Sequence, residues 1–138
     1  MSKKATVQQP AVAPPPPARR RAQTFLTPAT PEAGRALLTA SEPEGDFQAR
    51  VVTLAETTGW RWWHDYDSRR NARGFPDLVL VRGEHLVFAE LKTARGSLTR
   101  EQRIWLVALT RVANASGGAV SVYHWRPGDW SQIERVLR

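Results

Sequence analysis

Two apolar strands joined by a tight turn constrain the fold more than any other segment of this chain. Residues 77–81 and 86–92 have strand composition, and Arg82-Gly83-Glu84-His85 between them has the composition of a turn. Three charged residues interrupt this apolar hairpin: Asp77, Glu90 and Lys92. A carboxylate among buried strand residues must be neutralised, hydrogen-bonded or bound to a cation. The hairpin therefore predicts a metal site more clearly than any other segment.

The register of this hairpin brings the two carboxylates together. If the hairpin closes symmetrically about its turn, Val81 lies opposite Leu86 and Asp77 lies opposite Glu90. Directly opposed side chains share a face of the sheet with Cβ atoms about 4.5–5.5 Å apart, where two negative charges repel. Only a proton or a cation makes that pair tolerable. The prediction depends on the turn, because a shift of one residue would separate the carboxylates.

The oxygen atoms near this pair suit a hard cation. Lys92 shares the face of Glu90 because side chains alternate along a strand, and Leu91 leaves its carbonyl near the same edge. The chain has no cysteine and three scattered histidines, which disfavours a zinc site. Two carboxylates, a carbonyl and water predict Mg²⁺, with Mn²⁺ as the alternative. The competing interpretation is a structural ion-pair cluster in which Lys92 bridges both carboxylates.

Lys92 differs in kind from the other basic residues. After position 40 the chain has 14 Lys and Arg residues, and Lys92 is the only lysine among them. An ammonium group is a compact charge whose pKa can be depressed, whereas a guanidinium group stays protonated. We therefore expect Lys92 to orient or deprotonate a nucleophilic water, or to stabilise charge on a phosphoryl oxygen.

Length and composition indicate one domain with a tail. A chain of 138 residues has room for one core of about 100 residues. Seven of the ten prolines fall in the first 40 residues, so we expect residues 1–38 to be a disordered tail and residues 39–138 to fold. No apolar run approaches the roughly 20 residues of a membrane span. We expect a soluble, cytoplasmic protein with no membrane partner.

The net charge of +7 predicts a polyanionic partner, but much of this charge lies in the tail. Residues 1–40 hold six Lys and Arg against one Glu, while the remainder holds 14 against 12 acidic residues. The run Arg19-Arg20-Arg21 either binds phosphate or belongs to a solvated linker. Four later arginines are candidate ligands for nucleic-acid phosphates, with an ordinary solvated loop as the alternative for the first three: Arg69, Arg70, Arg73 and Arg95.

The segment before the hairpin predicts one helix and one strand. Ser41 and Glu44 have the spacing of a helix-capping box, and Gly59 ends the helix. The apolar stripe of this helix consists of Phe47, Val51, Leu54 and Ala55. Residues 60–66 then predict a strand with Trp60, Trp62 and His64 on one face. On such a strand His64 is either a packed, hydrogen-bonded histidine or a catalytic base.

The segment after the hairpin predicts a helix, a strand and a short final helix. Thr99 and Gln102 have the spacing of a second capping box. The predicted stripe of the helix consists of Ile104, Trp105, Ala108, Leu109 and Val112. Residues 119–125 read as a buried strand, and a last helix begins at Asp129. The order is αβββαβ plus a short C-terminal helix, which predicts an α/β fold with a mixed sheet between helices.

The charged residues of the hairpin belong to a longer pattern that carries a resemblance. This pattern resembles the PD-(D/E)XK nuclease superfamily, specifically its VRR-NUC (virus-type replication-repair nuclease) domain. It consists of Gly74-x-Pro76-Asp77, then Glu90-x-Lys92, then Gln102-x-x-Trp105. The similarity covers roughly residues 41–134, and it includes Trp125-Arg126-Pro127 near the end of this range. It implies a restriction-endonuclease-like core.

The resemblance also implies roles for individual residues. Asp77 and Glu90 would be metal ligands together with the Leu91 carbonyl, and Lys92 would be the catalytic lysine. Gln102 would be a supporting polar residue of the site. The acid of the first helix is Glu44, Glu42 or Asp46, and Glu44 is preferred because it shares the stripe that faces the sheet. Both Glu44 and Gln102 can equally be read as capping-box residues.

The resemblance implies a Mg²⁺-dependent DNA endonuclease that acts on branched, junction or flap DNA in replication, repair or recombination. It further implies a homodimer and products that carry a 5′-phosphate. Two other interpretations remain open. One is a non-catalytic nucleic-acid-binding module of the same fold, and the other is a proline-rich arm that docks a partner protein.

Overall fold

The computed structural model describes residue 32, residues 39–66 and residues 72–138. Its main elements, in chain order, are α2 (Glu44–Thr57), β1 (Arg61–His64), β2 (Leu78–Arg82), β3 (His85–Leu91), α3 (Arg100–Ala115), β4 (Val120–Trp125), η1 (Pro127–Asp129) and α4 (Trp130–Leu137). This order confirms the predicted α/β fold. The predicted disorder of residues 1–38, with Arg19 to Arg21, concerns a segment that lies almost wholly outside the described residues.

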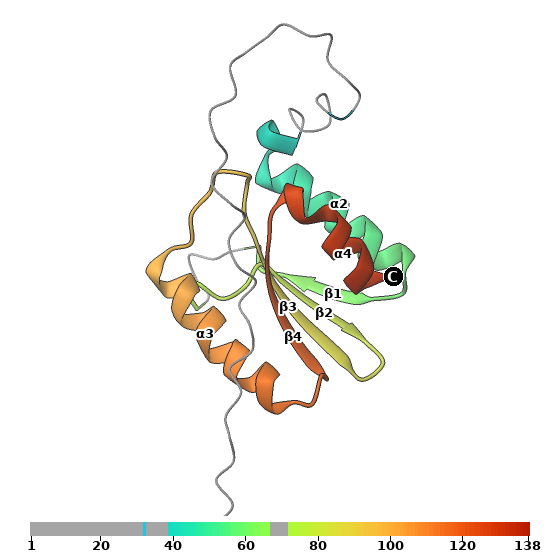
Figure 1. The fold of residues 1–138 in the computed structure, drawn as a ribbon, viewed down its shortest axis with the longest axis vertical. Coiled ribbons are helices and arrows are strands. Elements are labelled where there is room, and N and C mark those ends of the chain that lie inside the picture. Colours follow the sequence, from blue (N-terminus) through green and yellow to red (C-terminus); the bar gives the residue numbers. More distant parts are fainter. Residues whose placement is uncertain (1–31, 33–38, 67–71) are drawn as a thin grey trace, which may run out of the picture.

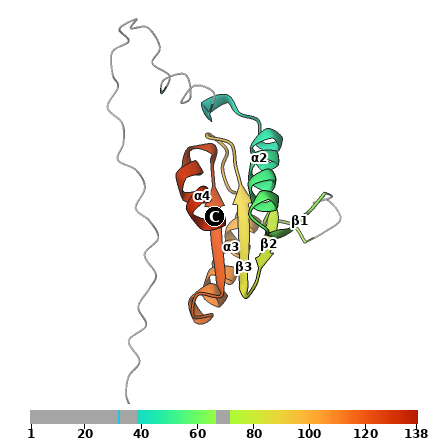
Figure 2. The same ribbon diagram turned by 90° about the vertical axis from the view of Figure 1, so that its right-hand side faces the viewer.

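The four strands form one mixed sheet in the order β1-β2-β3-β4. β1, β2 and β3 are successively antiparallel, whereas β3 and β4 are parallel. A parallel pair needs a crossover connection, and α3 supplies it on one face of the sheet. Figures 1 and 2 show α3 on one side of the sheet and both α2 and α4 on the other.

The core lies between the sheet and the pair α2 and α4. Its buried apolar residues are Phe47, Val51, Leu54, Ala55, Trp60, Leu78, Leu80, Val87, Ala89, Leu91, Trp125, Ile133 and Leu137. The stripe predicted for the first helix is therefore confirmed. Arg82 closes one end of this layer, since its guanidinium donates to the carbonyls of Thr58 and Leu137, each at 2.9 Å.

The start of α2 differs from the prediction. The helix begins at Glu44 with Pro43 as its N-cap, and no side chain caps it, so the box of Ser41 and Glu44 is wrong. A box begun at Ser41 would require Glu42 to be helical immediately before a proline, where the proline ring disfavours the helical conformation. Residues 39–41 are helical instead, and Glu42 and Pro43 separate them from α2. Glu44 is consequently the first residue of α2 rather than a capping partner.

The sheet-facing side of α3 also differs in part. The capping box of Thr99 and Gln102 is confirmed. Trp105 and Leu109 are half-buried as predicted, but the other three members of the predicted stripe are exposed, with Ile104 58% exposed, Val112 56% exposed and Ala108 also on the outer side. The helix has apolar residues around much of its circumference, and its packing turns the side with Trp105, Leu109 and Ala113 toward the sheet. None of its residues, all of which are described, is fully buried.

Membrane insertion through a helix has no support in the described residues, none of whose helices is long and apolar enough to cross a bilayer.

Candidate active site

The register of the hairpin places Asp77 beside the end of β3. Val81 pairs with Leu86 and Leu78 pairs with Ala89, which confirms the predicted register. Asp77 directly precedes β2, and its Oδ2 atom accepts a hydrogen bond from the backbone N–H of Leu91 at 2.7 Å. The two carboxylates therefore meet at one end of the hairpin, with Asp77 fixed by the backbone of the neighbouring strand.

Glu90 is the most deeply buried charged residue of this site. The side chain is fully buried, and its Oε1 atom accepts hydrogen bonds from Lys92 Nζ at 2.6 Å and from Gln102 Nε2 at 2.5 Å. Its Oε2 atom is also buried but has no hydrogen-bond partner among the described residues. Buried polar atoms are almost always satisfied by protein, water or an ion. Either a proton shared with the Asp77 carboxyl group, whose hydrogen bond contributes to the raised pKa of Glu90, or a bound cation would satisfy this oxygen.

Burial and neighbouring charges shift the pKa values of both Glu90 and Lys92. Burial raises the pKa of Glu90 from its ordinary 4.5 to about 7, and the charge of Asp77 adds to this effect while Lys92 opposes it. Burial alone would lower the pKa of Lys92, but the hydrogen bond and charge of Glu90 outweigh it, so the pKa is raised. Lys92 is therefore a cation near neutral pH, which favours a role in orienting groups or balancing charge over deprotonating a water.

α2 contributes Glu44 to the same site. Its Oε2 atom lies 3.9 Å from Lys92 Nζ, and about half of its side chain is exposed. Glu42 instead pairs with Arg50 at 2.9 Å, and Asp46 lines a groove beside α4. Of the three candidate acids on this segment, the structure thus brings Glu44 to Lys92.

The loop before β2 is docked on α3, which aligns Asp77 with Gln102. Gly74 has φ +81°, and a Cβ atom there would overlap the carbonyl carbon of Glu101 and lie 2.6 Å from the backbone nitrogen of Gln102. Trp105 Nε1 donates to the carbonyl oxygen of Arg73 at 3.1 Å. The Phe75 ring packs edge-on against Trp105 at 5.0 Å between centroids. The Gly-x-Pro-Asp and Gln-x-x-Trp motifs are therefore two sides of one contact.

A family model agrees with this arrangement of motifs. The model of the VRR-NUC domain matches residues 33–125, which is more than half of the chain. The chain belongs to the VRR-NUC domain family. It therefore carries a nuclease domain, for which DNA is the substrate. The match ends at the last residue of β4, before η1 and α4. No curated protein and no solved structure matches the chain.

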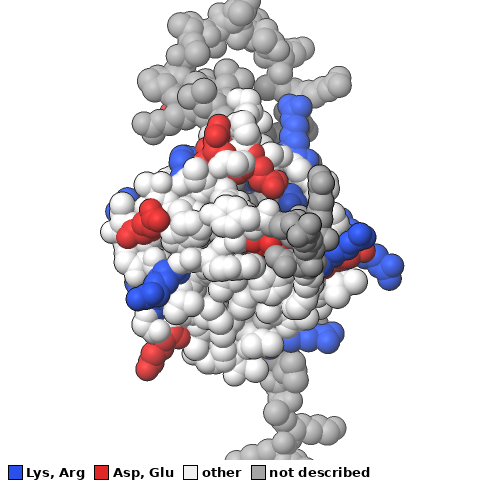
Figure 3. Space-filling view, turned by 180° about the vertical axis from the view of Figure 1, so that it is seen from behind, with Lys and Arg blue, Asp and Glu red and all other residues white. Residues whose placement is uncertain are grey.

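The arginines predicted to contact nucleic acid are only partly described in this VRR-NUC domain. Arg69 and Arg70 lie outside the described residues, while Arg73 and Arg95 are exposed. Figure 3 shows one face on which basic and acidic side chains lie scattered around a broad area that carries neither. On that face the described part of the domain presents no continuous basic surface, as the nearly balanced charge after residue 40 suggests.

His64 supports the backbone of the VRR-NUC site. Its Nδ1 atom lies 3.0 Å from the carbonyl oxygen of Asp77, and its ring packs edge-on against Tyr66. These contacts match the packed, hydrogen-bonded interpretation. They fix the chain just where Asp77 leaves the loop and β2 begins.

Sequence reasoning missed His124. It is the register partner of Glu90 across the parallel pair β3 and β4, so both side chains lie on the face of the sheet that α3 covers. Its Nε2 atom is buried without a hydrogen-bond partner in the described part of the chain. Burial lowers the pKa of His124, and the charges of Arg126 and Lys92 lower it further. The pairing with Glu90 depends on the crossover through α3, which no local pattern reveals.

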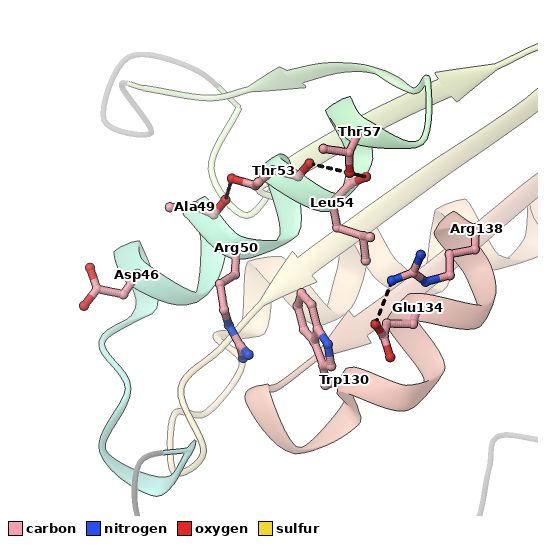
Figure 4. A pocket seen from close by; sticks show the side chains of 9 residues that line it. All are labelled: Asp46, Ala49, Arg50, Thr53, Leu54, Thr57, Trp130, Glu134 and Arg138. Carbon is pink, nitrogen blue, oxygen red and sulfur yellow. Dashed lines mark hydrogen bonds and ion pairs between the residues drawn. The ribbon is translucent and has the colours of Figure 1, made fainter. Parts of the chain in front are cut away.

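A groove between α2 and α4 lies on the opposite face of the sheet (Figure 4). Its wall includes Arg50, whose guanidinium stacks on the Trp130 ring at 4.1 Å and also pairs with Glu42. Arg138 and Glu134 pair with each other at 3.1 Å. Both ion pairs lie on their own side of the groove, and the stacking of Arg50 on Trp130 is the contact that links α2 to α4 there.

Proposed function

We propose that this VRR-NUC domain is a Mg²⁺-dependent endonuclease that hydrolyses phosphodiester bonds in DNA. The single observation that carries the proposal is the buried Oε2 atom of Glu90, which lacks a protein partner among the described residues while Asp77 approaches the same strand end. An anionic oxygen in that position is stabilised by a cation. A module that only bound phosphate would gain nothing from two carboxylates there.

The residues present fit a hard cation. Asp77, Glu90 and the Leu91 carbonyl offer only oxygen atoms, as Mg²⁺ prefers, and Mn²⁺ accepts the same set. No three Asp, Glu or His side chains of the described residues are arranged so that together they could hold a metal ion, so a carbonyl and water molecules would complete the coordination. When bound, such a cation lowers the pKa of a coordinated water and neutralises phosphate charge.

The chain's own residues hold the reacting groups in place. Gln102 donates to Glu90 Oε1, which holds that carboxylate against the start of α3. Lys92 keeps its proton near neutral pH and supplies a positive charge beside the carboxylates. In this proposal the Lys92 ammonium orients the attacking water and balances negative charge on the phosphoryl oxygen. Glu44 lies 3.9 Å from the ammonium, where its negative charge attracts the lysine.

Two finer properties belong to the same proposal. The domain acts on branched, junction or flap DNA during replication, repair or recombination, leaving a 5′-phosphate, as its family membership suggests. It works as a homodimer. The exposed apolar side chains of Ile104, Val107 and Val112 on α3 support this, since exposed apolar patches commonly mark interfaces between proteins.

A cleavage assay tests the proposal. The protein is incubated with labelled branched, flapped, duplex and single-stranded DNA in Mg²⁺, in Mn²⁺ and in EDTA. We expect cutting that EDTA abolishes and that Asp77→Asn or Lys92→Ala reduces by about 10²–10⁴-fold. Asp46→Asn is the matched control, because Asp46 is an exposed carboxylate on α2 outside the site.

Two outcomes would overturn the proposal. Unchanged cutting by folded Asp77→Asn and Lys92→Ala would remove the assigned residues from the chemistry. DNA binding by the native protein without any metal-dependent cutting would instead identify a non-catalytic binding module.

A further inference from the structure

Lys92 is followed at once by a tight turn. The backbone N–H of Lys92 donates to the carbonyl of Trp125 at 3.0 Å, which extends the pairing of β3 and β4 by one bond. The chain then reverses, and the N–H of Gly96 approaches both the carbonyl oxygen of Thr93 at 3.2 Å and its Oγ1 atom at 2.9 Å. The turn from Thr93 to Gly96 is therefore closed by its own hydrogen bonds.

Arg126 holds this turn from the neighbouring strand. Its Nη1 atom donates to the carbonyl oxygen of Thr93 at 2.6 Å. The backbone N–H of Arg126 in turn donates to Asp129 Oδ2 at 2.9 Å, which fixes the start of η1. The guanidinium is half-buried, where a charge-assisted hydrogen bond is stronger than at the surface. The end of β4 is thus tied to the residue that directly follows Lys92.

The tied turn packs against the side chain of Lys92. A Cβ atom at Gly96 would lie 3.3 Å from Lys92 Cδ and 3.0 Å from Thr93 Oγ1, so any larger residue there would push the lysine stem or the Thr93 hydroxyl by a few tenths of an ångström. At the other end of the side chain, Lys92 Nζ donates to Glu90 and to the Leu91 carbonyl at 3.1 Å. Lys92 is therefore confined along its length and is 9% exposed.

We propose that Arg126 is a positioning residue for Lys92, acting through the turn from Thr93 to Gly96. The proposal rests on the proposed function, in which Lys92 is the catalytic lysine. A lysine side chain has much rotamer entropy to lose, so a fixed turn along its stem prepares the ammonium for the reaction. A misplacement of about 1 Å in a catalytic group costs about 10²-fold in rate.

Kinetics of matched arginine variants provide the first test. Arg126→Met keeps an apolar side chain but removes the donors to Thr93. Arg82→Met is the control, because Arg82 also donates from a half-buried position to backbone carbonyls, but at the far end of β2 from Asp77. We expect Arg126→Met to lower kcat by about 10²-fold at unchanged KM. Arg82→Met should lower the melting temperature and leave kcat per folded molecule within about twofold of native.

Lysine-selective NMR provides a test that does not depend on activity. The chain has three lysines, Lys3, Lys4 and Lys92, so ¹³C-lysine labelling gives few signals to assign. In the native protein we expect inequivalent ε-methylene protons and restricted motion for Lys92. In Arg126→Met and in Gly96→Ala these signals should shift toward the averaged values of a free lysine, while Arg82→Met leaves them unchanged.

The outcomes separate this inference from the proposed function. Unchanged Lys92 signals in folded Arg126→Met would overturn the positioning role, and so would a loss of kcat no larger than that of Arg82→Met. If the native protein cuts no DNA, the nuclease proposal fails, but the NMR comparison still decides whether Arg126 fixes Lys92.

Discussion

Glu90 holds an ionisable carboxyl group where solvent does not reach. Its side chain is fully buried, and its pKa is raised to about 7, mainly by that burial. Near neutral pH the carboxyl group therefore lies close to the midpoint between its neutral and charged forms. A cation or the Lys92 ammonium favours the charged form, and a proton competes with both.

This raised pKa predicts a specific dependence of stability on pH. The folded protein binds the Glu90 proton more tightly than the unfolded chain, where the pKa is near 4.5. The stability contributed by Glu90 is therefore complete below pH 4.5 and is lost as the pH rises through 7. To test this loss of stability, the free energy of unfolding by urea is measured in EDTA at pH 5 and pH 8. The comparison is with Glu90→Gln, whose amide has no proton to lose in this range.

We expect the native protein to lose more free energy of unfolding than Glu90→Gln between these two pH values. Other titrating groups are shared by both proteins, so they largely cancel in the difference. Parallel pH profiles for the two proteins would show that Glu90 does not carry a raised pKa.

The local sequence pattern predicted which site residues one hairpin brings together. It did not predict which residues the crossover through α3 brings to the site. Asp77 and Glu90 follow from a symmetric turn, and the observed pairing of Val81 with Leu86 agrees. His124 and Arg126 reach the site only because β4 returns parallel to β3. That pairing depends on how α3 packs on the sheet, and a single sequence carries no direct signal of it.

At the scale of elements, the contact between α3 and the loop before β2 determines how Asp77 and Gln102 lie relative to each other. Gly74→Ala should break this contact, because the new methyl group would meet the α3 backbone and φ is +81°. Gly59→Ala is the control for backbone strain alone, since Gly59 has φ +83° and nothing within 4 Å of its Cβ position. We expect Gly74→Ala to cost about 1–3 kcal/mol more than Gly59→Ala in urea unfolding. Equal losses would show that the contact contributes nothing beyond backbone conformation.

Helix boundaries and helix faces were predictable to different degrees. The capping box of Thr99 and Gln102 was correct because no proline interrupts it, whereas the box begun at Ser41 contains Pro43. The face of α3 was partly wrong. Apolar residues surround much of that helix, so several overlapping stripes have helical spacing and only tertiary packing selects one.

The whole molecule has one well-buried layer and one thinly covered face. α2 and α4 bury the core residues, while no residue of the fully described α3 is buried. If the outer side of α3 joins two copies, Ile104→Glu and Val107→Glu should convert a dimer into a monomer in sedimentation velocity at micromolar concentration. Gln132→Glu is the control, since it adds the same charge to an exposed position on α4. A native protein that is monomeric throughout would refute this interface.

The site draws on segments that are far apart along the chain: α2 through Glu44, the end of the hairpin through Asp77 and Glu90, and the residue after β4 through Arg126. Closing such long loops is slow, and two of them must close before Glu44 and Arg126 reach the surroundings of Lys92. A refolding chain can therefore pair Asp77 with Glu90 in the early, locally ordered hairpin while Glu44 and Arg126 are still far from them. The competent arrangement should emerge only with the last cooperative step, so that partly folded copies leave DNA intact.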